Sequence, residues 1–190
     1  MLLSLLFQKQ LIKQLEIFDR EKFEIFLITL FEYKNIPNLY EKVPLDVHVF
    51  RIGIKSKLDI KGLWKLFKVL KEISPNVVVT SMFSANTVFR FMKLFLGYKV
   101  FAREHNIYLE KKWWQTRVDK CLSKITNKII AVSKTVAEFA SKQAGISMEK
   151  FIVIHNGVEI NEIEKYKNSF SKMEARQKTN IPTDSIVFLN

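Results

Sequence analysis

Polar side chains that could bind a ligand follow three short apolar runs of the sequence. They are Glu104, His105 and Asn106 at the end of the run 98–104, Ser133 at the end of the run 127–133, and Asn156 and Gly157 at the end of the run 151–157. An imidazole, a carboxylate, amides and a hydroxyl can hydrogen-bond a polar substrate, and an imidazole can also move a proton. A lone histidine such as His105 has a structural role as often as a functional one, and the residue types leave both interpretations open.

The elements that must position these side chains alternate along the chain. Short apolar runs at 24–33, 46–52, 76–81, 98–104, 127–133, 151–157 and 185–190 predict strands, and helical spacing at 2–17, 61–73, 84–96, 114–125, 134–144 and 159–178 predicts helices. Ser84 and Ser133 are expected N-caps, and Gly97 and Gly145 lie where helices usually end. This alternation predicts a Rossmann-like, doubly wound parallel α/β sheet. Ligands of such sheets bind beyond the carboxyl ends of the strands, so the polar strand ends are expected at one edge.

Composition limits the class of protein. The chain has 190 residues, 48% of them hydrophobic, which suits one domain with a sizeable core. Its one cysteine, Cys121, excludes a disulfide framework and favours a reducing compartment, and we expect no metal site. The opening residues are a poor signal peptide, and no apolar run is long enough for a spanning helix. The nucleotide-binding, metalloprotease and hydrolase motifs GxxxxGK, GxGxxG, HExxH and GxSxG are absent from the sequence.

The net charge of +12 is concentrated in the middle of the chain. Residues 55–128 carry sixteen basic and five acidic side chains, an excess of eleven. A basic surface attracts the phosphates of nucleic acids, nucleotides or anionic lipids, or it is simply a solvated face. Within this region, the predicted helix 61–73 has lysines on one face and apolar residues on the other. Such a helix either packs on a sheet with its lysines in water or lies on an anionic bilayer.

The stretch 110–120 combines cations with adjacent indole rings. Its members are Lys111, Lys112, Trp113, Trp114 and Arg117. Neighbouring tryptophans point in different directions on a regular element, so one of the two is hard to bury. Indoles beside cations are typical of a membrane interface, although they also stack on nucleic acid bases or pack in a core.

Several longer stretches together resemble a known family. They are SPNVVVTSMFSAN (74–86), FAREHN (101–106), the run from Asp119 through CLSKITNKIIAVSKTVAEF (121–139), and QAGISMEKFIVIHNGVEI (143–160). From Asp59 to Ile160 their order and spacing resemble the N-terminal domain of family 4 glycosyltransferases, bacterial retaining enzymes of the GT-B fold. The block from AVSKTVAEF to HNGVEI is the specific part of this resemblance.

The resemblance implies a function and a site. In the family, an N-terminal domain that holds a sugar or lipid-linked sugar acceptor faces a C-terminal domain that holds a nucleotide sugar, with no further cofactor. Glu104, His105, Asn106, Ser133, Asn156 and Gly157 would then line the cleft between the two domains, with His105 touching the transferred sugar. Lys111, Lys112, Trp113, Trp114 and Arg117 would contact an anionic membrane. The resemblance therefore implies a cytoplasmic, peripheral protein on the inner face of the plasma membrane.

The chain also departs from the family pattern. The family's first strand and glycine-rich loop would precede Met1, and Val79 and Ser81 replace histidines found in many relatives. Residues 1–180 are expected to form an incomplete N-terminal domain, and 181–190 the first strand of an absent C-terminal domain. In the strand order 3-2-1-4-5-6, loss of the first strand exposes two inner strand edges. We therefore expect a chain that is inactive alone and marginally soluble unless another segment or a separate C-terminal-domain chain joins it. A non-catalytic membrane-surface module is the alternative, and nucleic acid binding is a weaker one.

Overall fold

The computed structural model describes residues 2–31, 40–56, 59–157 and 160–187. The chain divides into two compact units, Met1–Asn156 and Gly157–Asn190. Every strand among the described residues belongs to the first unit.

Two parallel sheets form the centre of the first unit. Strands β1 (Phe26–Thr29) and β2 (His48–Arg51) pair with each other. Strands β3 (Val77–Ser81), β4 (Lys99–Glu104), β5 (Lys128–Ala131) and β6 (Phe151–Val153) form the second sheet in that order. The predicted α/β architecture with parallel strands is confirmed.

The break between the sheets lies between β1 and β3. Ile28 of β1 and Val78 of β3 nevertheless pack against one apolar cluster, which includes Leu66 and Phe89 from two helices. Within the described part of the chain, β3 pairs only with β4. On its other face Val77 and Val79 are 51% and 54% exposed. This break falls where the order 3-2-1-4-5-6 places its first strand.

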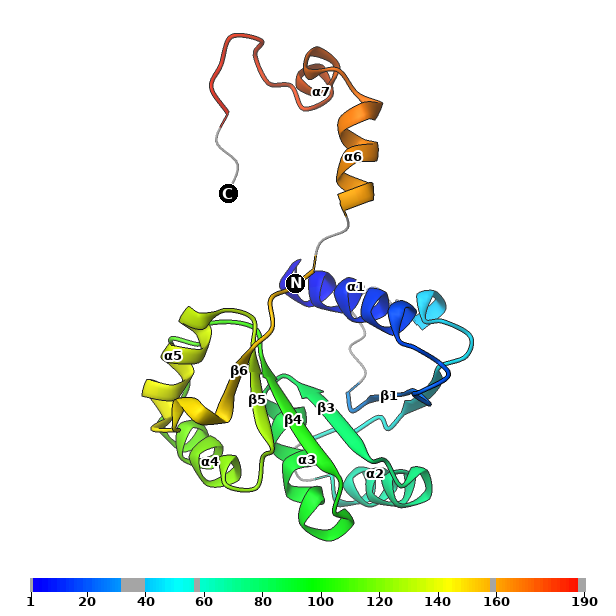
Figure 1. Ribbon diagram of the computed structural model, residues 1–190, viewed down its shortest axis with the longest axis vertical. Coiled ribbons are helices and arrows are strands. Elements are labelled where there is room, and N and C mark those ends of the chain that lie inside the picture. Colours follow the sequence, from blue (N-terminus) through cyan, green and yellow to red (C-terminus); the bar gives the residue numbers. More distant parts are fainter. Residues whose placement is uncertain (1, 32–39, 57–58, 158–159, 188–190) are drawn as a thin grey trace. The chain divides into compact units, whose positions relative to one another are not determined.

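Helices cover both faces of the sheets (Figure 1). Helices α2 (Ile60–Ile73), α3 (Phe83–Leu96), α4 (Trp113–Ser123) and α5 (Lys134–Ala144) lie along one side of the strands, and α1 (Leu2–Ile17) lies on the other. Ile12 and Leu15 of α1 pack near Leu27 of β1, and Val136 and Ala137 of α5 pack on β5 and β6. Short 3₁₀ helices, η1 (Tyr40–Lys42) and η2 (Met148–Lys150), complete this unit.

Helix ends follow the sequence signals with one exception. Ser133 Oγ accepts a hydrogen bond from Val136 N at 3.2 Å, and Gly97 and Gly145 end their helices at φ 75° and 61°. The predicted N-cap at Ser84 is wrong. Helix α3 begins at Phe83 because Met82, at φ 75°, turns the chain one residue earlier and its carbonyl accepts from Asn86 N at 2.8 Å.

In the described part of the second unit the chain forms the helices α6 (Ile160–Ser169) and α7 (Lys172–Lys178). Ser171 and Glu174 cap α7 reciprocally, which accounts for the interruption of the single helix expected over 159–178. Of the strand expected at 185–190, residues 185–187 have no regular structure, and 188–190 lie outside the described residues. The family domain boundary at 180/181 stays a prediction.

Candidate functional site

The register of the four-stranded sheet brings the predicted strand ends to one edge, which we call the carboxyl edge. Ser81 of β3 pairs with Arg103 of β4, and Glu104 pairs with Ala131 of β5. His105 Nε2 lies 3.4 Å from Ser81 Oγ, so the imidazole bridges the ends of two strands. At the next strand pair, His155 Nδ1 lies 3.1 Å from Val132 O.

The imidazole of His105 has a strongly shifted pKa. Burial, together with the nearby positive charge of Arg103, lowers its pKa from 6.5 to about 4. At neutral pH the ring is therefore uncharged, with one nitrogen available as a donor and the other as an acceptor. Such a ring hydrogen-bonds a neutral polar ligand without adding charge to the site.

Glu104 turns into the domain and away from the carboxyl edge. Its side chain is 12% exposed, and Oε1 lies 3.8 Å from Lys111 Nζ. Lys111 Nζ lies 2.5 Å from Asp119 Oδ2, and Arg90 Nη2 donates to Asp119 Oδ1 at 2.5 Å. We call these four residues the ion cluster. It contains two cations and two carboxyl groups, so its charges balance when both carboxyls are ionised.

Burial raises the pKa of Glu104, while the positive charge of Lys111 opposes the rise. The ion cluster borders a cavity of about 10 Å³, which has room for one water molecule at most. A sugar therefore cannot reach the Glu104 carboxyl through this cavity. The expectation that Glu104 lines a cleft is corrected for its side chain, because Lys111, in the loop before α4, draws it toward the ion cluster.

The predicted membrane-contact residues separate into two groups. The Lys111 side chain is 9% exposed and belongs to the ion cluster, so its predicted membrane contact is corrected. Lys112 and Arg117 are exposed, and Arg117 lies over the Trp113 ring at 5.3 Å from its centroid. Trp113 is 71% exposed, whereas Trp114 meets Phe83 of α3 edge to face, with ring centroids 5.6 Å apart. One indole of the pair is thus free to meet a surface.

The remaining predicted residues lie on the loops that follow the strands. Asn106 and Asn156 are exposed, and Ser133 is half-buried with its hydroxyl at the N-terminus of α5. Gly157 is the first residue of the second unit. The geometry therefore brings Ser81, His105 and the 132–133 loop to one edge of the first unit.

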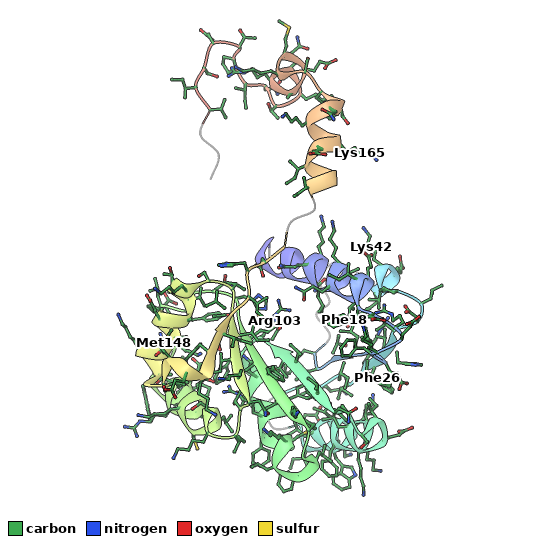
Figure 2. All side chains as sticks on the ribbon, viewed as in Figure 1. Phe18, Phe26, Lys42, Arg103, Met148 and Lys165 are labelled. Atoms are coloured by element: carbon green, nitrogen blue, oxygen red, sulfur yellow. The ribbon has the colours of Figure 1, made fainter. Side chains whose placement is uncertain are left out.

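Sequence reasoning missed three polar residues behind this edge. Asn86 of α3 is 2% exposed, accepts from Thr80 Oγ1 at 2.7 Å and donates to Arg103 O at 3.2 Å. Arg103 is 9% exposed and donates from Nη1 to Gln14 Oε1 of α1 at 2.7 Å; Figure 2 shows it on the side of the sheet that faces α1. Arg90 lies in the ion cluster. Asn86 and Arg90 interrupt an otherwise apolar helix, and that interruption is the signal that could have revealed them.

The turn that leads from β3 into α3 is strained. Met82 adopts φ 75°, a left-handed conformation that costs a residue with a Cβ about 1–3 kcal/mol. The strain occurs directly after Ser81, the hydroxyl that contacts His105. Strained turns of this kind are concentrated at ligand sites. No group of three acidic, histidine or cysteine side chains within the described ranges could hold a metal ion.

Comparison with solved structures shows that the fold is that of a GT-B glycosyltransferase half. A glycosyltransferase from Rickettsia africae ESF-5 matches 92% of this chain and 45% of its own, with a TM-score of 0.68 and 15% identity. Anabaena Alr3699/HepE, solved in complex with UDP, matches 69% of this chain and 38% of its own, with a TM-score of 0.51 and 20% identity.

Sequence comparison identifies the family. The model of Glycosyltransferase Family 4 matches residues 13–162, and the chain belongs to that family. The O-antigen biosynthesis glycosyltransferase WbnH and the probable O-antigen biosynthesis glycosyltransferase WbiN, both from Escherichia coli, are each 30% identical to it over 111 residues. That match covers 56% of this chain and 33% of each relative, so the chain spans about a third of their length.

Proposed function

We propose that the first unit binds the acceptor of a glycosyl transfer, and that this acceptor is a sugar or a lipid-linked sugar. The complete enzyme would be a hexosyl-type transferase in O-antigen, polysaccharide or glycolipid synthesis. The observation that carries this proposal is the uncharged His105 imidazole held beside Ser81 at the carboxyl edge. Sugar hydroxyls are neutral donors and acceptors, and they suit a neutral imidazole and neighbouring hydroxyls and amides. The family assignment and the O-antigen relatives support the same substrate class.

A nucleotide sugar is the donor in this proposal. Transfer from it requires stabilisation of the charge that develops on the leaving diphosphate. In the family that charge is met by the C-terminal domain, and the Rickettsia enzyme is about twice as long as the part matched here. We therefore propose that this chain does not turn over alone and that a C-terminal domain, in a longer or a separate chain, completes the site.

The test is an assay of the isolated chain with common nucleotide sugars and alkyl glycoside acceptors. We expect no transfer above background, and measurable transfer would contradict the need for a second domain. Acceptor binding is measured separately by NMR, from the backbone amide chemical shift of Ser81, whose hydroxyl lies beside His105. Saturable shifts that disappear in His105→Ala and persist in the exposed-site control His48→Ala support the proposed site, and unchanged shifts at every acceptor concentration reject it.

A second candidate function is a non-catalytic membrane-surface module, located on the cytoplasmic side of the plasma membrane. The observation that favours it is Trp113, exposed beside Arg117 and Lys112. Within the described residues, no helix is both long and apolar enough to span a bilayer. Indoles with adjacent cations bind at the headgroup level of anionic bilayers.

Co-sedimentation with vesicles tests this candidate. Anionic vesicles should retain the chain more than neutral ones, and Trp113→Ser should weaken retention, whereas Leu45→Ser, at an exposed apolar side chain before β2, should not. Equal retention on neutral and anionic vesicles would reject the candidate. Salt-sensitive retention on DNA or RNA that exceeds retention on vesicles would favour nucleic acid binding instead.

A further inference from the structure

Lysines surround a hollow at the amino-terminal end of the four-stranded sheet. The hollow has a volume of about 380 Å³ and is lined by residues 124–127 together with Lys93, Leu94 and Lys150. Strand β5 begins directly after Asn127, and β6 begins directly after Lys150. The hollow therefore lies at the opposite end of these strands from the carboxyl edge, and we call it the lysine hollow.

The ammonium groups of the lysine hollow are held by neutral acceptors. Lys93 Nζ donates to Ile125 O at 2.5 Å and to Asn127 Oδ1 at 2.7 Å, and Lys150 Nζ donates to Thr126 O at 3.0 Å. Each ammonium has three N–H groups, so both retain donors beyond these bonds. No acidic side chain is among the residues that line the hollow. Its positive charge is thus left for an external anion to neutralise.

The electrostatics of Lys93 agree with this geometry. Burial lowers the pKa of Lys93, and the positive charge of Lys150 lowers it further. Two like charges are therefore held close together with no carboxylate on the walls between them. An anion placed in the hollow would relieve that repulsion.

The rim of the lysine hollow is apolar on the side of α3. Leu94 lines the hollow and is 57% exposed, and Phe91 and Phe95 beside it on α3 are also exposed. On the same helix the polar side chains of Asn86 and Arg90 are buried, whereas these apolar side chains are exposed. This end of α3 therefore presents apolar side chains to the solvent directly beside three cations.

A purely structural role accounts for part of this arrangement. Carbonyls at the end of α4 attract cations, and Lys93 and Lys150 bind carbonyls just beyond that end. Lys124 is different, because it is exposed and the structure shows no hydrogen bond from its ammonium to any described residue. Helix capping does not explain a third cation on the wall.

We propose that the lysine hollow binds a phosphate group, with Lys93, Lys124 and Lys150 as its donors. Lysine ammonium groups form charge-assisted hydrogen bonds to phosphate oxygens, and three cations match a group that carries more than one negative charge. Leu94 would contact the apolar part of the molecule that carries the phosphate. This site is independent of the proposed acceptor site at the carboxyl edge.

Pyrophosphate titration of the whole chain tests the site. We expect saturable stabilisation against thermal unfolding, relative to sodium chloride of equal ionic strength, and amide shifts in NMR at Asn127 and Lys150. Lys124→Gln should weaken the apparent affinity about tenfold, the loss expected for one hydrogen bond to a charged group. Lys71→Gln, the same change at an exposed lysine on α2, should leave the affinity unchanged.

Absence of saturation would overturn the proposal, and so would an equal effect of Lys71→Gln and Lys124→Gln. Vesicles distinguish the source of the phosphate. Binding to phosphatidic acid in phosphatidylcholine vesicles that both Lys124→Gln and Leu94→Ser abolish supports a lipid headgroup as the ligand. Saturable pyrophosphate binding with no preference for phosphatidic acid supports a soluble phosphate compound.

Discussion

At the carboxyl end of the four-stranded sheet, Arg90 and Lys111 lie beside the carboxyl groups of Asp119 and Glu104. At the amino end, Lys93 and Lys150 donate to backbone carbonyls and a side-chain amide. The first set is almost completely buried, and the second lines an open hollow. Arg90 and Lys111 are therefore compensated by carboxyl groups inside the domain, whereas Lys93 and Lys150 are held by neutral groups alone.

This difference determines what each end of the sheet can do. Carboxyl groups neutralise Arg90 and Lys111, and Arg103 is held by the neutral Gln14 on the side of the sheet that faces α1. The side chains of His105, Ser81 and Ser133, which reach the carboxyl edge, are uncharged. Neutral groups of this kind suit the hydroxyls of a sugar. The lysine hollow keeps its net positive charge and suits an anion.

Removal of an acid from the ion cluster should have the largest effect. Asp119→Ala leaves Arg90 and Lys111 without their shared counter-ion inside the domain. Breaking a buried charge pair in this way costs about 3–5 kcal/mol of unfolding free energy. Urea denaturation followed by circular dichroism measures the loss.

Glu110→Ala is the matched control for that variant, because Glu110 is an exposed acid that belongs to the same segment. We expect its unfolding free energy to change by about 0.5 kcal/mol or less. Equal losses in the two variants would show that the ion cluster does not stabilise the carboxyl end.

Protonation of His105 should give the next largest effect. Its pKa of about 4 in the folded chain lies below the 6.5 of an ordinary histidine, so between these values the unfolded chain binds more protons. The unfolding free energy therefore falls as the pH decreases from 6.5 to 4, by at most about 3 kcal/mol from this group. His105→Gln should remove that part of the pH dependence.

NMR titration of the His105 ring protons checks this prediction directly. A midpoint near pH 4 agrees with a ring that burial and Arg103 keep uncharged. A midpoint at the ordinary value would mean that His105 is hydrated and that the carboxyl edge is no more neutral than the rest of the surface.

The strands and helices were predictable because their signals are local. The apolar run 76–81 follows Ser74 and Pro75, and the run 127–133 follows Thr126 and ends at Ser133. Such runs between turn-forming residues are typical of strands in a parallel sheet. The break between β1 and β3 falls at the position that the order 3-2-1-4-5-6 gives to the family's first strand. These features depend on neighbouring residues or on topology alone.

The orientation of the charged side chains was not predictable, because it depends on helix packing. Asp119 is 29 positions from Arg90, and the two meet only when α4 packs on α3. That contact turns Glu104 and Lys111 inward, although their positions in the sequence predict a cleft and a membrane surface. The N-cap of α3 depends in the same way on the left-handed backbone at Met82 and not on the serine at position 84.

Two serines that give the same sequence signal should differ in their effect on stability. Ser133 Oγ accepts from Val136 N and caps α5 at the carboxyl edge, so Ser133→Ala should lower the unfolding free energy by about 1 kcal/mol. Ser84 lies inside the first turn of α3, and Ser84→Ala should change it by about 0.5 kcal/mol or less. Urea denaturation of both variants measures the difference, and a larger loss at Ser84 would contradict the helix start at Phe83.

The smallest effect on stability is expected in the lysine hollow, and it should depend on the anion present. In a chloride buffer, Lys124→Gln should change the unfolding free energy by about 0.5 kcal/mol or less, since this exposed lysine has no internal counter-ion to lose. With pyrophosphate present, the wild-type chain should gain stability in proportion to the occupancy of the site, and the variant should gain less. Melting temperatures of both chains in each buffer separate the two contributions. If Lys124→Gln destabilises the chain equally in both buffers, the lysine already has a partner within the protein and the contrast between the two ends of the sheet is wrong.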